Sequence, residues 1–355
     1  MKKMIKLSLV AAVAVAGLTT SATAGSLENA IKDTTISGKA MIGYNFKDNG
    51  ITNTNSNQTE YDLDITMTTK VNDTISFTSG LQADHDVAID ADQNTDTNSK
   101  ANGDKITLTK AYFTAKTDVA TVMIGKQKQP TPFLDDERGD GVVALIPAGP
   151  VTIAAGHFTG MNSGLSAQDI TAAAVIGSAG PVNGSLWYAK EAGIIDGTSL
   201  SLAANVGPVK IDFRHSTAEL IDVANSEAET LTKVIVSGKA ADVNLVLGYG
   251  MTNDTAARVH GVDLTTDEDG KTNFRLDQLV LDGLSDADAL LLGASMTFGA
   301  TTVGANYLMV DLNTAGTSDA TELDVNVKYA MSKNFNITGL YSDTNDVGGD
   351  DTRME

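Results

Sequence analysis

The chain has 355 residues, no cysteine and a formal charge of −20, from 25 lysine and arginine residues against 45 aspartate and glutamate residues. An acidic balance of this size excludes a nucleic-acid-binding protein that relies on phosphate contacts, because the phosphates would be repelled. The absence of cysteine excludes disulfide scaffolds, cysteine-ligated zinc sites and thiol catalysis. A hydrophobic content of 42% is too high for a disordered acidic chain.

Residues 1–24 have the layout of a secretory signal peptide. Three lysines among the first six residues precede the apolar stretch 7–18, and Ala-Thr-Ala at 22–24 has the small residues of a cleavage site. The alternative is a membrane anchor, but a spanning helix needs about 20 apolar residues and this stretch is shorter. We therefore expect an exported protein whose mature chain begins at Gly25.

The rest of the chain alternates apolar and polar residues with a period of two. In segment 61–68, Tyr-Asp-Leu-Asp-Ile-Thr-Met-Thr, every odd position is apolar and every even position is polar. Segments 209–214 and 323–329 repeat the pattern. Because successive side chains of a strand point to opposite faces, these segments predict strands with one apolar and one polar face.

Short turns and long loops follow one another in strict alternation. Gly-Pro-Val occurs three times and predicts three tight turns. With these copies at 149–151, 180–182 and 207–209, the short reversals are predicted near 71–73, 117–118, 240–241, 299–300 and 332–333. Longer polar loops are predicted near 48–58, 88–104, 127–140, 160–168, 191–196, 217–228, 252–286, 312–319 and 344–350.

Eight short turns and nine long loops connect eighteen strands. This pattern predicts an all-β protein, a transmembrane antiparallel β-barrel with short periplasmic turns and long extracellular loops, formed as a single domain by residues 25–355. A soluble sandwich or a β-solenoid would also alternate, but a dry core could not hold so many charges in mid-strand. The last strand would start near Asp351, and it lacks the aromatic end typical of such barrels, so we expect it to be truncated.

Several motifs resemble the Campylobacter-type major outer membrane proteins. They are the segments 1–12, 27–33, 36–38, 125–127, 132–133, 141–145 and 149–156. The resemblance implies an eighteen-stranded trimeric porin of the bacterial outer membrane, which agrees with the strand count. It also implies contact with outer-membrane lipid and lipopolysaccharide, passage of ions and small hydrophilic solutes, and no enzymatic activity.

The loop 127–140 is the third long loop of the predicted barrel. In trimeric porins this loop folds inward and narrows the channel, so the resemblance implies the same role here. Two prolines would stiffen the loop, an aromatic side chain would hold it to the inner wall, and acidic side chains would give the channel a negative field. The constriction residues are Pro130, Pro132, Phe133, Asp135, Asp136, Glu137, Arg138 and Asp140. The alternative is a solvated surface loop.

Charged residues with inward parity would line the channel opposite this loop. The expected wall charges are Lys39, Asp62, Asp64, Lys210, Asp212 and Arg214, together with Lys110 and Lys126, whose parity is ambiguous. Because charged rings select ions by sign, the acidic excess predicts a mild preference for cations.

No cofactor is expected, but one calcium motif stays open. The acidic residues Asp267 and Asp269 lie in the longest loop, and the EF-hand pattern fails there because Thr265 occupies a position that needs an acid or amide. The runner-up function is a structural or adhesive barrel protein whose surface loops bind a partner.

Overall fold

The computed structural model describes residues 33–49, 54–90, 105–134, 138–161, 169–221, 227–254, 271–313, 319–346 and 349–354. The expected signal peptide, 1–24, lies outside these residues. Across the described part of the chain, no helix is long and apolar enough to cross a membrane.

The described residues form eighteen β-strands, as the alternation of turns and loops predicts. Their bounds are β1 Thr34–Asn49, β2 Thr54–Lys70, β3 Ile75–Asp90, β4 Lys105–Lys116, β5 Thr121–Lys128, β6 Arg138–Ala148, β7 Val151–Met161, β8 Ile170–Ala179, β9 Val182–Glu191, β10 Ile195–Val206, β11 Val209–Leu220, β12 Glu229–Ala240, β13 Val243–Thr252, β14 Ala287–Phe298, β15 Thr301–Leu312, β16 Ala320–Ser332, β17 Phe335–Asp346 and β18 Gly349–Met354.

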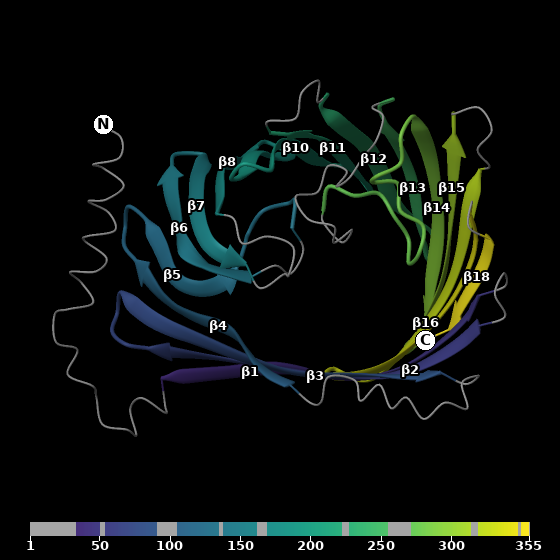
Figure 1. Cartoon of the computed structure of the whole chain (residues 1–355), viewed down its shortest axis with the longest axis horizontal. Coiled ribbons are helices and arrows are strands. Elements are labelled where there is room, and N and C mark those ends of the chain that lie inside the picture. The colour runs from purple at the N-terminus through teal and green to yellow at the C-terminus, as the bar shows by residue number, and fades with distance from the viewer. Residues whose placement is uncertain are drawn as a thin grey trace.

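The strands form one antiparallel sheet that closes on itself. Each strand pairs with the next one along the chain, and β18 pairs with β1 from Phe46↔Met354 to Asn49↔Asp351. Figure 1 shows the resulting ring of strands, with β1–β4 on one side and β10–β12 on the other. The strand β18 has 6 residues and also pairs with β17. The predicted barrel is therefore confirmed.

All eight predicted short turns lie between strands. In the three Gly-Pro-Val copies, Gly149, Gly180 and Gly207 have φ of 65°, 59° and 62°. Glycine adopts this left-handed conformation without the steric penalty of a Cβ atom, and a glycine at the first central position suits a tight hairpin. The proline that follows donates no hydrogen bond, and it lies in the turn rather than in the strand ladder.

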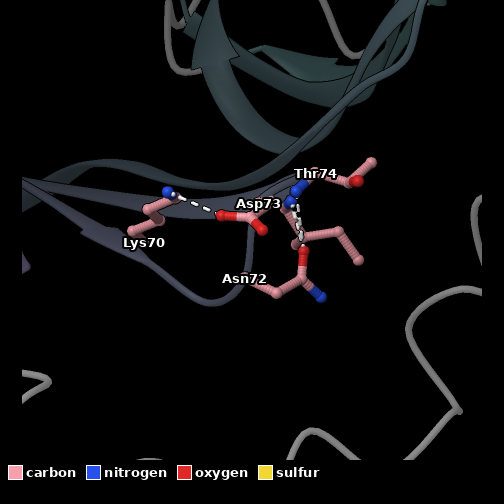
Figure 2. Close-up of polar contacts among 5 residues, drawn as sticks. Lys70, Asn72, Asp73 and Thr74 are labelled. Atoms are coloured by element: carbon pink, nitrogen blue, oxygen red, sulfur yellow. Dashed lines mark hydrogen bonds and ion pairs between the residues drawn. The ribbon is translucent and has the colours of Figure 1, made fainter.

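The turn between β2 and β3 is closed by side chains instead (Figure 2). The Asn72 Oδ1 atom accepts hydrogen bonds from the backbone N–H groups of Thr74 and Ile75, at 2.9 and 2.8 Å. The Lys70 Nζ atom lies 2.9 Å from Asp73 Oδ1, and this hydrogen bond is the main reason why the pKa of Asp73 is lowered. The Asn72 contacts form an Asx turn, which explains a tight reversal without glycine.

At the opposite end of the barrel, most strands run further than the sequence predicts. The pairing of β1 with β2 continues to Asn49↔Thr54, inside the segment 48–58 that was expected to be a loop. The segment 191–196 reduces to a three-residue turn between β9 and β10. Polar residues remain in the ladder here because backbone pairing does not require apolar side chains.

Candidate functional site

The two faces of the sheet differ in exposure. On β13, Leu245, Leu247 and Tyr249 point to one face and are 45%, 49% and 46% exposed. The alternate residues Gly248 and Gly250 lie on the other face, where Phe274 covers both. Because Phe274 belongs to a segment that lies inside the ring (Figure 1), the glycines mark the inner face. The exposed leucines mark the outer face, as expected for a wall that contacts lipid.

The segment that follows β5 packs on the inner wall through apolar side chains. Phe133 is fully buried and Leu134 is 2% exposed. A Cβ atom added to Gly197 of β10 would lie 3.2 Å from Cε1 of Phe133. The aromatic ring therefore sits directly over a wall position without a side chain. Both Phe133 and Leu134 belong to one apolar cluster with inward residues such as Ile195 and Ala218.

The remaining described residues of this loop, 129–134, lie along the same wall. Pro130 and Thr131 line a small cavity with Phe158 and Trp187 of the wall. Pro132 is buried. The loop is thus held against the strands β6–β10, and it is visible inside the ring in Figure 1. The acidic residues Asp135, Asp136 and Glu137 lie outside the described residues.

Two residues that were expected in the loop lie in a strand. Arg138 and Asp140 are part of β6, because pairing with β5 extends to Lys128↔Arg138. Asp140 lies opposite Lys126 in this ladder. By register, Lys126 shares a face with Phe113, which stacks on Phe77 of the outer face. Lys126 and Asp140 are therefore placed on the outer face near the end of the strands.

A bulge in β4 explains why the parity of Lys110 is ambiguous. Leu81 pairs with Leu108 whereas Gly80 pairs with Lys110, so Thr109 is an extra residue in β4. A bulge of this kind reverses the facing of every later side chain relative to simple alternation. Lys110 points inward, and its Nζ donates a hydrogen bond of 3.0 Å to Thr66 Oγ1 of β2.

The strands β1 and β2 carry a mixed group of charges on the inner face. Lys39 pairs in register with Asp64, and its Nζ lies 3.7 Å from Asp62 Oδ2 on the diagonal. The Asp62 side chain is 16% exposed and that of Lys39 is 62% exposed. This group has one cation and two carboxylates, so it is acidic in sum.

The strand β11 carries the other inward charges that the sequence predicts. Lys210 and Asp212 form an ion pair of 2.9 Å, and Arg214 donates a hydrogen bond of 3.0 Å to Ser199 Oγ of β10. This group is basic in sum. Figure 1 places β11 across the ring from β1 and β2, so the basic and acidic groups face each other through the interior.

A second inward segment, 271–286, was not recognised from the sequence. It precedes β14 and lies inside the ring (Figure 1). Phe274 and Leu281 are 3% and 0% exposed and pack over Gly250, where an added Cβ atom would approach both within 2.8 Å. The signal available was the apolar content of 271–286 within the longest loop, namely Phe274, Leu276, Leu279, Val280, Leu281 and Leu284.

The calcium candidates Asp267 and Asp269 lie outside the described residues. Among the residues that are described, no group of three or more histidine, cysteine, aspartate or glutamate side chains could hold a metal ion. The described wall charges are spread over several strands, among them β1, β2, β4 and β11.

Solved porin structures share this fold. OccK3 (OpdO) of Pseudomonas aeruginosa superposes with a TM-score of 0.73 at 13% identity, over 92% of this chain and 96% of that chain. A BenF-like porin from Pseudomonas fluorescens Pf-5 gives 0.71 at 14% identity, over 91% and 97%. OccK2 (OpdF) of Pseudomonas aeruginosa, solved in complex with glucuronate, gives 0.68 at 15% identity, over 91% and 95%. At these identities the likeness shows the fold.

The family of this chain is assigned from its sequence rather than from its fold. The profile of the Campylobacter major outer membrane protein family matches residues 1–179, whereas no curated protein matches the chain. The matched half includes β1–β8, the loop 129–134 and the whole acidic wall group on β1 and β2. The chain therefore belongs to the Campylobacter major outer membrane protein family, an outer-membrane porin whose fold and family point to a channel rather than an enzyme.

Proposed function

We propose that the protein forms a water-filled channel for passive diffusion of ions and small hydrophilic solutes, with a mild preference for cations. The observation that carries this proposal is the inner face, where charged side chains on β1, β2 and β11 line a closed ring. A wet interior can hold these charges, whereas a dry one would impose a desolvation cost of several kcal/mol for each ion.

Single-channel recording in planar bilayers tests the proposal directly. The purified protein is expected to give stepwise conductance that scales with salt concentration. Absence of conductance from a folded barrel, verified by heat-modifiable mobility on gels, would favour the structural or adhesive alternative.

The loop after β5 is proposed to form the constriction. Burial of Phe133 and Leu134 on the wall supports this role, because it fixes the loop inside the ring. The following acids, Asp135, Asp136 and Glu137, would then enter the channel next to the wall that carries Arg214. In this arrangement the loop and the basic wall are neighbours, and the acidic group of β1 and β2 faces them both.

Neutralising the loop acids should weaken cation preference. In the triple variant Asp135→Asn, Asp136→Asn and Glu137→Gln, we expect the reversal potential in a salt gradient to move toward zero or to the anion side, since fixed charges select ions by sign. The matched control is Asp73→Asn, an acid in the β2–β3 turn, which should leave the reversal potential unchanged. An unchanged potential in the triple variant would show that these acids do not reach the ion path.

We further propose that three copies assemble, as the family resemblance implies. The partners of the outer face would then be lipid, lipopolysaccharide and neighbouring copies. Chemical cross-linking in intact outer membranes, followed by gel analysis, is expected to give a species of three chains.

A further inference from the structure

We propose that Glu322 is the positioning residue that keeps the segment 271–286 folded into the channel, so that this carboxylate sets the size of the open pore. The inference rests on the proposed channel function. It concerns a residue on the wall, in β16, that does not itself face the ion path, since its side chain is fully buried.

Several backbone N–H groups of the segment 271–286 need hydrogen-bond acceptors, and Glu322 supplies acceptors for some of them. Apart from an isolated bridge between Arg275 and Val280, its described residues belong to no strand. Its N–H groups therefore need partners outside a ladder, because an unpaired and buried backbone donor is costly.

Glu322 supplies acceptors for three consecutive donors. Its Oε1 atom accepts hydrogen bonds from the N–H groups of Asp277 and Gln278, at 3.0 and 2.8 Å, and its Oε2 atom accepts one from Leu279 at 2.5 Å. The hydroxyl of Ser342 on β17 donates a fourth, at 2.8 Å to Oε1. Hydrogen bonds to a charged acceptor are stronger than neutral ones, so this clamp fixes the turn 277–279 to the wall.

Two other contacts hold the same segment further along the ring. Lys233 of β12 donates hydrogen bonds to the carbonyl groups of Lys271, at 2.8 Å, and Asn273. Phe274 and Leu281 pack over Gly250 of β13. The segment is thus fixed at β12, β13 and β16, and the side-chain amide of Gln278 donates a further hydrogen bond of 3.1 Å to Ser342 Oγ of β17. Loss of the Glu322 contact would remove the three backbone hydrogen bonds that tie 277–279 to the wall.

Only an ionised carboxylate can accept all of these bonds. A glutamine at this position has one acceptor oxygen, and its amide N–H₂ group would face backbone donors. We therefore expect Glu322→Gln to release the turn 277–279, to increase single-channel conductance and to produce rapid fluctuations of the open level. Amide hydrogen exchange at Asp277, Gln278 and Leu279 should accelerate by about tenfold or more, because local opening exposes donors that are protected in the wild type.

The matched control is Asp324→Asn. Asp324 lies two residues further along β16 and is 5% exposed, so the variant alters a neighbouring buried carboxyl group on the same face. Both Glu322 oxygens remain in this variant as acceptors for the three loop donors, so exchange at 277–279 should stay near the wild-type rate.

Three outcomes distinguish the Glu322 clamp from a simple charge effect and from failure of the proposed channel function. Faster exchange and higher conductance in Glu322→Gln alone support the clamp. Equal conductance changes in Glu322→Gln and Asp324→Asn, with unchanged exchange, would overturn it in favour of a simple charge effect. A wild-type barrel without conductance would instead contradict the proposed channel function, while the exchange measurement would still test the clamp.

Discussion

Replacing Phe133 with alanine should give a channel of higher conductance. The ring of Phe133 is fully buried over Gly197 and belongs to the apolar cluster that joins the loop 129–134 to the wall. Removal of a buried phenylalanine side chain costs about 3–5 kcal/mol, so the loop should be held more weakly against the wall and open more often. Single-channel recording of Phe133→Ala against the wild type measures the change in conductance.

The control for this experiment is Phe298→Ala. Phe298 is 58% exposed and lies on the outer face at the end of β14, so its removal deletes the same side chain without touching the loop. Its conductance should equal that of the wild type. If Phe133→Ala also conducts like the wild type, although its barrel is folded by heat-modifiable mobility, the loop does not limit the current.

A charge placed on the outer face should destabilise the barrel strongly. Leu247 lies in the middle of β13, is 49% exposed and points to the lipid side. An arginine on the lipid face near mid-membrane costs about 2–4 kcal/mol. Urea titration of Leu247→Arg in lipid vesicles is therefore expected to give a free energy of unfolding lower by about this amount.

The neighbouring residue provides the comparison. Val246 is adjacent in sequence but points inward, and its partners across the sheet are Ser237 and Gly293. Both are small, so Val246→Arg can extend into the wet interior, and its cost should be much smaller. Equal destabilisation by both variants would mean that the assignment of inner and outer faces in this part of the sheet is incorrect.

The strands and turns could be predicted because their signals are local. Alternation reports one wet and one apolar face within a few residues, and Gly149, Gly180 and Gly207 mark turns through their own backbone preference. The ion pair between Lys210 and Asp212 and the inward direction of Arg214 also follow from alternation in an unbroken strand.

The remaining features depend on tertiary contacts that sequence reasoning could not provide. The facing of Lys110 is reversed by the extra residue Thr109, and a bulge has no reliable local signature in β4. The inward fold of 271–286 depends on Glu322, which is more than 40 residues away along the chain. Glu322 lies just before the alternating segment 323–329, and that local pattern gives no sign of the loop that it binds.

Closure of the ring has a consequence for the order of assembly. Seventeen of the pairings join strands that follow one another, so they can form as local hairpins at low entropic cost. The contact between β1 and β18, in contrast, joins Phe46 to Met354 across nearly the whole chain. Closing this long-range contact has a high entropic cost until the hairpins are in place. We therefore expect the β1–β18 pairing to form last, after the other seventeen strand pairings.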